Sequence, residues 1–209
     1  MPKAWMQDRK RDYYYKKAKE ENYRSRAAYK LLQAVKKYQF IKEGDVVVDL
    51  GAAPGGWVQA ASKIVGSKGF VLGVDLRPVE PFEEDNVRTI VGDINEEDTI
   101  QQILELLPRK ADAVISDVSP NISGIWEVDH ARQMDLAQKG LSIALETLRP
   151  LGNFFAKVFQ GDMLDDFTSK VKTHFQVAKV VKPQASRGRS SELFMLGLSL
   201  KKWQDERQS

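Results

Sequence analysis

The chain has 209 residues, of which 42% are hydrophobic and 29% charged, with two histidines and no cysteine. This length and composition are typical of one globular domain and exclude a disordered or fibrous chain. The lack of cysteine excludes disulfides, thiolate metal sites and thiol nucleophiles, and two histidines argue against a multi-histidine zinc site or a Ser-His-Asp triad. Carboxylates, lysines, backbone amides or a bound cofactor therefore have to supply any chemistry, and we expect no metal.

No stretch of the sequence approaches the ~20 apolar residues that span a bilayer. The segment 1–17 is too polar to act as a secretory signal, which requires an apolar region. We therefore expect a cytoplasmic protein without membrane contact.

The net charge of +3 conceals a strongly basic N-terminal segment. Residues 1–42 carry 13 of the 32 Lys and Arg but 4 of the 29 Asp and Glu, a net charge of +9, so the remainder carries −6. All six tyrosines also lie in this segment. Cations with interleaved aromatic rings are typical of RNA contacts; the alternative is a solvated helical arm whose tyrosines pack on the body. A second basic stretch lies between residues 179 and 202, and the sequence does not say whether the two stretches meet.

The first predicted element is an amphipathic helix over roughly 24–38, docked on the rest of the domain. Its apolar stripe consists of Ala28, Leu31, Leu32 and Val35. The opposite stripe, which we expect to face outward, consists of Arg26, Lys30, Gln33 and Lys37.

Buried strands and helices then alternate along the chain, which predicts βαβ units and a mainly parallel sheet. The expected strands span 45–51, 70–76, 87–94, 111–118, 152–159, 177–183 and 192–200. The expected helices span about 57–65, 98–107, 131–149 and 163–173. Because no helix separates the last two strands, we expect an antiparallel hairpin at one edge of the sheet.

The first strand runs into a glycine-rich turn, DLGAAPGGW over 49–57, in which Gly51 and Gly55 let the backbone approach a ligand. The spacing is not G-x-G-x-x-G, and Pro54 removes an amide donor from the turn. A pyrophosphate needs such donors, whereas a nucleoside without phosphates, such as S-adenosylmethionine, does not.

Acidic residues end the next three strands: Asp75, Asp93 and Asp117. Asp75 is in the position that accepts ribose hydroxyls, and Asp93 is expected to reach the adenine amino group or its neighbours. One such acid alone is more often a helix cap or a turn former. The turn and the three acids together predict a nucleoside cofactor.

Given a methyl donor, the acceptor follows partly by exclusion. Pyrimidine C5 methylation generally needs a cysteine, and the loop DVSP over 117–120 lacks the Asn/Asp-Pro-Pro-aromatic pattern of exocyclic-amine methyltransferases. A hydroxyl, a ring nitrogen, or a protein or small-molecule substrate remains. Lys157 lies in the apolar run FFAKVF over 154–159, where a lysine is costly unless it reaches a cleft or snorkels to the sheet edge. Desolvation favours the neutral amine of a lysine, which can then accept a hydroxyl proton.

These motifs together resemble the FtsJ/RrmJ (RlmE-type) ribosomal RNA ribose 2′-O-methyltransferases over roughly residues 20–200. The matching segments are RSRAAYKL (24–31), DLGAAPGGW (49–57), DVSP (117–120), Lys157 and RSSE (189–192). A compact chain without cysteine also suits an archaeal member. The resemblance implies a Rossmann-like α/β S-adenosylmethionine-dependent methyltransferase fold, with a mostly parallel seven-stranded sheet and an antiparallel last strand.

The resemblance also implies the site. Its catalytic tetrad falls on Lys30, Asp117, Lys157 as proton acceptor, and Glu192. Its cofactor positions fall on Gly55, Trp57, Asp75, Asp93 and Asp117, to which the glycine turn adds Gly51 and Pro54. We expect RNA contacts from Lys16, Lys17, Lys19, Arg24, Arg26, Arg187 and Arg189.

The implied reaction is transfer of a methyl group from S-adenosylmethionine to the ribose 2′-OH of a uridine in large-subunit, 23S-type ribosomal RNA, free or within the subunit. We expect a basic extension over 1–42, a methyltransferase domain over 43–203 and a tail over 204–209, with no obligate protein partner. The alternatives are methylation of tRNA or of an RNA cap, an NAD-dependent oxidoreductase, and an RNA-binding subunit without activity. The oxidoreductase is disfavoured by the glycine spacing, and the inactive subunit by the complete tetrad.

Overall fold

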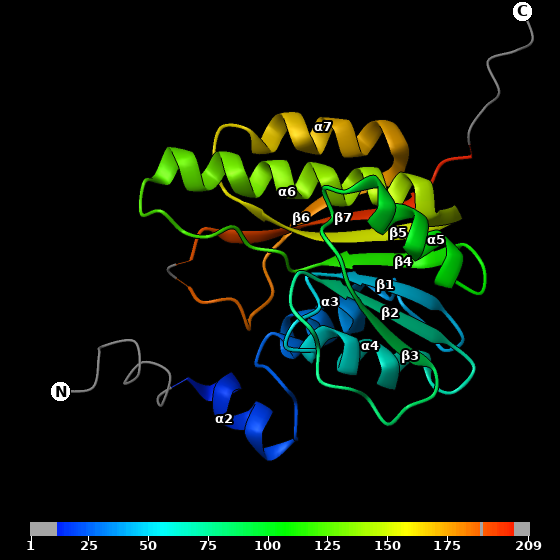
Figure 1. Cartoon of the computed structure of the whole chain (residues 1–209). Helices are drawn as coiled ribbons and strands as arrows, with labels where there is room; N and C mark the ends of the chain where they lie inside the picture. Colours follow the sequence, from blue (N-terminus) through cyan, green and yellow to red (C-terminus); the bar gives the residue numbers. More distant parts are fainter. Residues whose placement is uncertain (1–11, 189, 203–209) are drawn as a thin grey trace, which may run out of the picture.

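The computed structural model describes residues 12–188 and 190–202, which form a seven-stranded sheet between two layers of helices (Figure 1). The strands are β1 Val46–Leu50, β2 Phe70–Asp75, β3 Val87–Val91, β4 Ala111–Ser116, β5 Leu148–Phe159, β6 Phe175–Val181 and β7 Glu192–Leu200. The helices are α2 Tyr13–Glu20, α3 Ala28–Tyr38, α4 Gly56–Val65, α5 Glu97–Leu106, α6 Trp126–Thr147 and α7 Leu164–His174.

The strand order β3-β2-β1-β4-β5-β7-β6 confirms the predicted fold class. Strands β1 to β5 pair in parallel, and β7 runs antiparallel to both β5 and β6. The last two strands form the expected antiparallel pair at one edge, with β7 inside the sheet and β6 outermost. The carboxyl ends of β1, β4 and β5 therefore lie at the same end of the sheet as the start of β7.

Both faces of the central strands are covered, which explains why their sequences are almost continuously apolar. All residues of β1 and β4 are buried. Helices α5, α6 and α7 pack on one face, and α3 and α4 on the other (Figure 1). Among the described residues, no helix is long and apolar enough to cross a membrane.

The largest boundary differences from the sequence expectation are at the starts of α3, α6 and β5. The N-terminal amphipathic helix begins at Ala28 instead of near residue 24, and a separate helix, α2, precedes it. Asp12 caps α2, since its carboxylate accepts a hydrogen bond from the backbone N–H of Tyr15 at 3.3 Å. Helix α6 begins at Trp126, five residues earlier than expected, and β5 follows its last residue directly.

The expectation that Lys30 faces outward from its helix was wrong. The apolar side of α3 does pack on the sheet domain, with Ala28, Leu31 and Val35 in the same cluster as α4. Lys30, however, is only 9% exposed, because the start of β7 places Glu192 within 2.8 Å of its amine. A helical pattern alone does not reveal a partner that another strand brings to the polar face.

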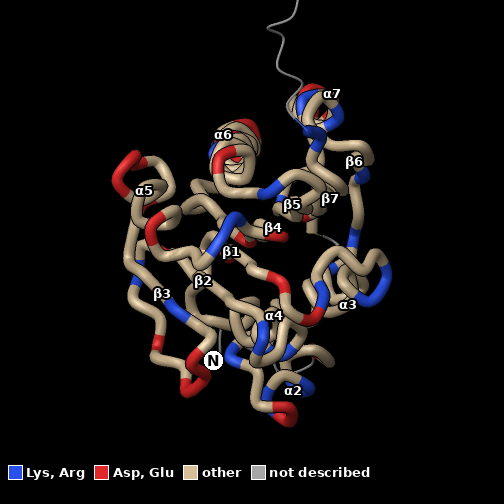
Figure 2. The backbone as a smooth tube through the Cα atoms, turned by 90° about the vertical axis from the view of Figure 1, so that its right-hand side faces the viewer, with Lys and Arg blue, Asp and Glu red and all other residues tan. Residues whose placement is uncertain are grey.

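The two basic stretches meet in the structure. Asp12, at the start of α2, forms an ion pair with Arg26 and lies 3.9 Å from Arg187 in the loop between β6 and β7. The same loop donates a backbone hydrogen bond from Ala185 to the Gln33 side chain on α3 at 2.9 Å. Figure 2 shows basic segments along α3 and β6 and acidic segments at α5 and near β3, so charge is unevenly distributed across the sheet.

Candidate active site

Lys157, on β5, points to the loop that follows β4 and is held there by two hydrogen bonds and an ion pair. Its Nζ lies 2.8 Å from Asp117 Oδ1 and donates to the Asp117 carbonyl oxygen at 2.9 Å and to Ser119 Oγ at 2.8 Å. Lys157 is 6% exposed, so nearly the whole of its side chain is buried. The lysine therefore reaches a polar cleft and does not snorkel to the sheet edge.

The other two tetrad residues complete a ring of alternating charge. Lys30 Nζ donates to Glu192 Oε2 at 2.8 Å, and it lies 3.7 Å from Asp117 Oδ1. Lys157 Nζ in turn lies 3.8 Å from Glu192 Oε2. Each carboxylate thus contacts both ammonium groups, which compensates the four partly buried charges for their loss of solvent. The structure brings all four predicted residues together, from α3, β5, β7 and the loop after β4.

A cavity of about 720 Å³ opens beside this ring at the carboxyl ends of the parallel strands. Its wall includes four of the predicted cofactor residues: Gly51, Asp75, Asp93 and Asp117. The wall also includes Val74, Leu76, Ile94 and Val118, so apolar surface faces the same space as the acids. Such a mixture of apolar walls and a few fixed polar groups is typical of a small-molecule site.

Asp75 has a dual role in shaping this cavity. Its Oδ2 accepts a hydrogen bond from the Ala53 N–H at 2.9 Å, and its Oδ1 accepts one from the Arg77 N–H at 2.9 Å. The first bond fixes the glycine-rich turn against β2. The exposed Arg77 guanidinium also lies 3.6 Å from Oδ1. Because a carboxylate offers about four acceptor positions, Asp75 can still accept hydrogen bonds from a ligand.

The remaining predicted cofactor positions, Pro54, Gly55 and Trp57, do not line the cavity. The Trp57 indole is buried, donates to the Ala27 carbonyl oxygen at 2.7 Å and stacks on Phe155. Its side chain therefore fixes the start of α3, and only its backbone remains to serve a ligand.

Gly55 is required by geometry, because its φ of 108° suits glycine and an added Cβ would lie 2.9 Å from both Arg24 and Phe82. The Arg24 guanidinium lies over the Phe82 ring at 3.6 Å and donates to the carbonyl oxygens of Glu80 and Pro81. This contact holds the loop after β2 against the glycine-rich turn.

Asp49, the last acid of β1 before the turn, is fully buried, and neither of its carboxylate oxygens has a hydrogen-bond partner among the described residues. Burial, reinforced by the nearby carboxylates of Asp117 and Asp75, raises the pKa of Asp49 well above its ordinary value. A raised pKa means that the unfolded chain loses this proton at lower pH than the folded chain. The contribution of Asp49 to stability is thus fully present below the unfolded pKa and is lost as pH rises through the folded pKa.

Sequence reasoning missed two hydroxyl groups in the site. Ser119 hydrogen-bonds Lys157, and Ser186 Oγ donates to Glu192 Oε1 at 2.9 Å. Ser119 follows Asp117 by two residues in the DVSP loop, so its position in that loop was a usable signal. Ser186 lies in the loop between β6 and β7, and no pattern in the sequence links that loop to the site.

The predicted RNA residues fall into two groups. Lys16 and Lys19 are exposed on α2, and the Arg187 side chain is 63% exposed. Lys17 pairs with Glu21 at 3.7 Å, while Arg24 and Arg26 are half-buried and bind protein groups. Arg189 lies outside the described residues. The tyrosines largely contact one another, since Tyr29 lies 5.4 Å from Tyr14 and 5.6 Å from Tyr23 between ring centroids.

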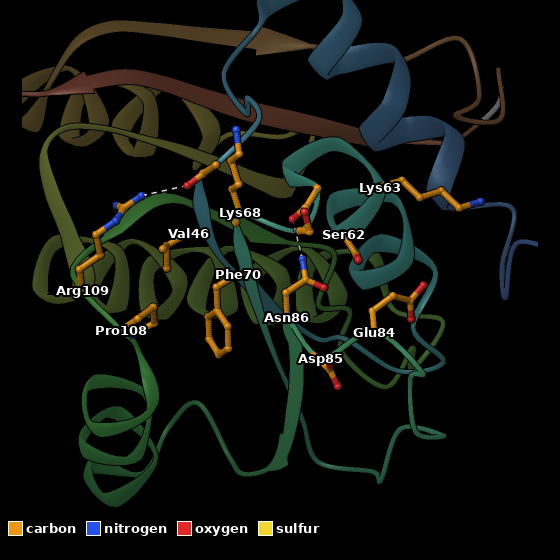
Figure 3. A pocket seen from close by; sticks show the side chains of 14 residues that line it. Val46, Ser62, Lys63, Lys68, Phe70, Glu84, Asp85, Asn86, Pro108 and Arg109 are labelled. Carbon is orange, nitrogen blue, oxygen red and sulfur yellow. Dashed lines mark hydrogen bonds between the residues drawn. The ribbon is translucent and has the colours of Figure 1, made fainter.

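A second cavity, of about 820 Å³, lies at the opposite end of the strands, where the parallel strands begin (Figure 3). Its wall includes the first residues of β1 and β2, Val46 and Phe70, together with Lys68, Asp85 and Arg109. The ring of charged residues and the glycine-rich turn are at the other end of these strands. Exposed residues of this cavity are therefore suitable controls for changes at the site.

Comparison with known proteins agrees with the fold. The family model described as FtsJ-like methyltransferase matches residues 23–200. The "Ribosomal RNA large subunit methyltransferase E" of Methanocaldococcus jannaschii is 53% identical, and the match covers 98% of this chain and 85% of that protein. The protein of the same name from Methanothrix thermoacetophila is 52% identical, and the match covers 91% of this chain and 73% of that protein. A crystal structure described as a ribosomal RNA methyltransferase from Plasmodium falciparum superposes with a TM-score of 0.73 at 26% identity, covering 85% of this chain and 98% of that one. The chain belongs to the FtsJ-like methyltransferase family.

Proposed function

We propose that this methyltransferase transfers the methyl group of S-adenosylmethionine to the 2′-OH of a uridine ribose in large-subunit ribosomal RNA. The observation that carries the proposal is the buried amine of Lys157, held in a ring of compensated charge at the edge of the acid-lined cavity. The methyltransferases named above, similar along most of this chain, carry a large-subunit ribosomal RNA name. This substrate also fits a cytoplasmic location.

The cavity fits S-adenosylmethionine in size and chemistry. Asp75 has free lone pairs for the two ribose hydroxyls, and Asp93 stands at the end of β3 for the adenine edge. The backbone of the glycine-rich turn, from Gly51 onward, approaches the same space. The bound cofactor supplies an activated methyl group, and the residues of this chain orient it and handle the proton of the acceptor.

In the proposed reaction, Lys157 accepts the proton of the ribose hydroxyl. As an ammonium group, Lys157 donates hydrogen bonds to the Asp117 carbonyl oxygen and to Ser119 Oγ, and it forms an ion pair with Asp117 Oδ1 at 2.8 Å. To accept a proton, the amine must be neutral and give up one of these contacts. Ser119 is exposed and its hydroxyl can turn away, whereas the backbone N–H of Asp117 is bonded to the Leu50 carbonyl oxygen at 3.3 Å. Lys30 and Glu192 hold the charge balance of the ring and bind the ribose beside it.

The proposal is tested by mapping 2′-O-methyl groups after incubation of the wild-type protein and tritiated-methyl cofactor with unmodified RNA. We expect methylation of one uridine in large-subunit ribosomal RNA or in the subunit that contains it. Methylation confined to tRNA or to a cap would assign the same chemistry to a different substrate and would contradict the ribosomal assignment.

Two lysines of α2 are expected to contact RNA phosphates. Lys16 and Lys19 are exposed, and the Lys19 amine lies 5.3 Å from the centre of the Tyr15 ring. Changing both to glutamate should weaken RNA binding and reduce the slope of log affinity against log salt by about 0.7–0.9 for each phosphate that the protein no longer neutralises. The measurement is RNA affinity over a series of salt concentrations.

The matched control for this prediction changes the same charge elsewhere, with Lys68→Glu and Lys139→Glu, both exposed and outside the site. The control pair should keep the wild-type slope. An equal reduction of the slope in both double variants would mean that RNA responds only to net charge, and it would remove α2 from the RNA-binding surface.

A further inference from the structure

Three large apolar side chains are exposed within the five consecutive residues 122–126, where the loop after β4 leads into α6. Ile122 is 64% exposed, Ile125 is 58% exposed and Trp126 is 45% exposed. Met163, in the loop after β5, is 37% exposed, and its N–H donates to His130 in the first turns of α6. A concentrated apolar patch of this kind usually marks a binding surface, unlike scattered single residues.

The loop that carries this patch is fixed in place. The buried carboxylate of Asp129 accepts hydrogen bonds from the N–H and the hydroxyl of Ser123 at 2.7 and 2.8 Å, and from the N–H of Gly124 at 3.0 Å. Gly124 has a φ of 87°, a conformation that favours glycine. Farther back, the Arg132 side chain donates to the Asn121 carbonyl oxygen. The apolar side chains are thus presented on a rigid support and cannot easily retract into the core.

The Trp126 ring is held by two other aromatic rings. It stacks on His130 with ring centroids 5.6 Å apart and on Phe159 at 6.0 Å, with interplanar angles of 23° and 18°. The His130 ring is in turn held by close packing, because it is 3% exposed and lies so near Gly161 that a Cβ added there would clash with it. A stack of this kind fixes the orientation of Trp126 while nearly half of its surface stays open to solvent.

This exposed ring is close to the catalytic ring of charge. Phe159 follows Lys157 by two residues on β5, so both side chains leave the same face of the strand, about 7 Å apart along it. The loop that leads into Trp126, the first residue of α6, begins with Asp117 and includes Ser119, and both residues contact Lys157 directly. Figure 1 shows α6 and α2 on opposite sides of the carboxyl ends of the strands, so the apolar patch and the α2 lysines flank the site.

We propose that Trp126, with Ile122 and Ile125, forms a stacking surface for a nucleobase of the substrate RNA, at or next to the methylated nucleotide. The inference rests on the proposed function, because only a polynucleotide whose ribose lies at Lys157 must place a base within one nucleotide of this surface. Sequence-specific RNA recognition mostly uses single-stranded segments, whose unstacked bases stack on aromatic side chains. The α2 lysines supply charge for phosphates, whereas the patch supplies apolar area, so the two surfaces have different tasks.

The test uses a single-stranded RNA oligonucleotide that carries the mapped methylation site, with Trp126→Ala and Trp126→Phe compared with wild type. Loss of one base–aromatic stack should raise the KM for this RNA by roughly 5- to 100-fold in Trp126→Ala. Trp126→Phe should retain most of the affinity, and the cofactor Kd should stay unchanged in both. RNA should quench tryptophan fluorescence in the wild type, and this quenching should be lost in Trp126→Phe. The melting temperature of each variant reports whether it is folded.

The outcomes separate this proposal from the function on which it rests. If the wild type methylates the RNA but neither KM nor quenching depends on Trp126, the stacking surface is wrong and the function stands. A defect of Trp126→Ala on assembled subunits but not on the oligonucleotide would assign the patch to a protein contact and overturn the proposal. If the wild type methylates no ribosomal RNA, the function fails and the stacking surface fails with it.

Discussion

Replacing Lys157 by alanine is expected to lower the rate of methyl transfer by a factor of roughly 10² to 10⁴, the usual contribution of a general base. The affinity for S-adenosylmethionine should change by no more than a fewfold, because Lys157 is outside the wall of the cavity. The measurement combines single-turnover methyl transfer to the mapped RNA with a cofactor titration. A loss of rate without a loss of binding identifies a residue that acts in the transition state.

A second variant separates chemistry from folding. Lys157 is buried on β5, so Lys157→Met keeps the apolar stem in place and removes only the amine. We expect Lys157→Met to be as inactive as the alanine variant and closer to wild type in stability. The control is Lys68→Ala, which should retain full activity, because Lys68 is exposed and lies where the parallel strands begin. Substantial turnover by Lys157→Met would exclude this residue as the base.

Replacing Asp75 by alanine is expected to have the opposite signature, with its main effect on cofactor binding. The carboxylate holds the Ala53 N–H of the glycine-rich turn and, in the proposed complex, accepts the ribose hydroxyls. Hydrogen bonds to a charged group contribute about 1.5–3 kcal/mol, so the cofactor Kd should rise by at least roughly 10- to 100-fold. Calorimetric titration of S-adenosylmethionine measures the change, and the rate at saturating cofactor should fall much less.

Two further variants test why Asp75 matters. Asp75→Asn retains one carbonyl acceptor and should have an intermediate Kd. Asp85→Ala removes an exposed carboxylate beside the second cavity and should bind the cofactor like wild type. A Kd for Asp75→Ala within threefold of wild type would contradict the proposed site, because no other described carboxylate both braces the glycine-rich turn and lines the cavity.

Much of the fold could be predicted because buried parallel strands carry a strong local pattern. The runs that became β1 and β4 are mostly apolar and fully buried, and they end at a glycine-rich turn and at Asp117, so the place of the site followed. Helix α2 was not predicted as an element of its own, since its sequence YYYKKAKE has no apolar stripe and it buries one residue, Ala18. A short polar helix is specified by its cap and its tertiary contacts more than by periodicity.

The site could be predicted from the sequence only in part, for a different reason. Asp75 and Asp117 are at strand ends, where topology alone brings side chains together. The inward turn of Lys30 depends on β7, which joins it from 162 residues away in sequence. The role of Trp57 in fixing α3 depends on a contact with Ala27 across two helices. Such contacts between distant segments have no signature in a window of sequence.

The position of β7 has a consequence for the order in which the protein becomes active. This strand is the last that the structure describes, yet it lies inside the sheet, where it pairs with β5 so that Phe159 is opposite Glu192 and Lys157 is opposite Phe194. The residues lining the cofactor cavity all lie between Gly51 and Leu136, so that cavity draws on contacts available early in synthesis. The catalytic ring, by contrast, closes only when the final strand inserts between β5 and β6. Long-range strand pairing is slow, so in the proposed enzyme we expect the cavity to form before the ring of Lys30, Asp117, Lys157 and Glu192 does.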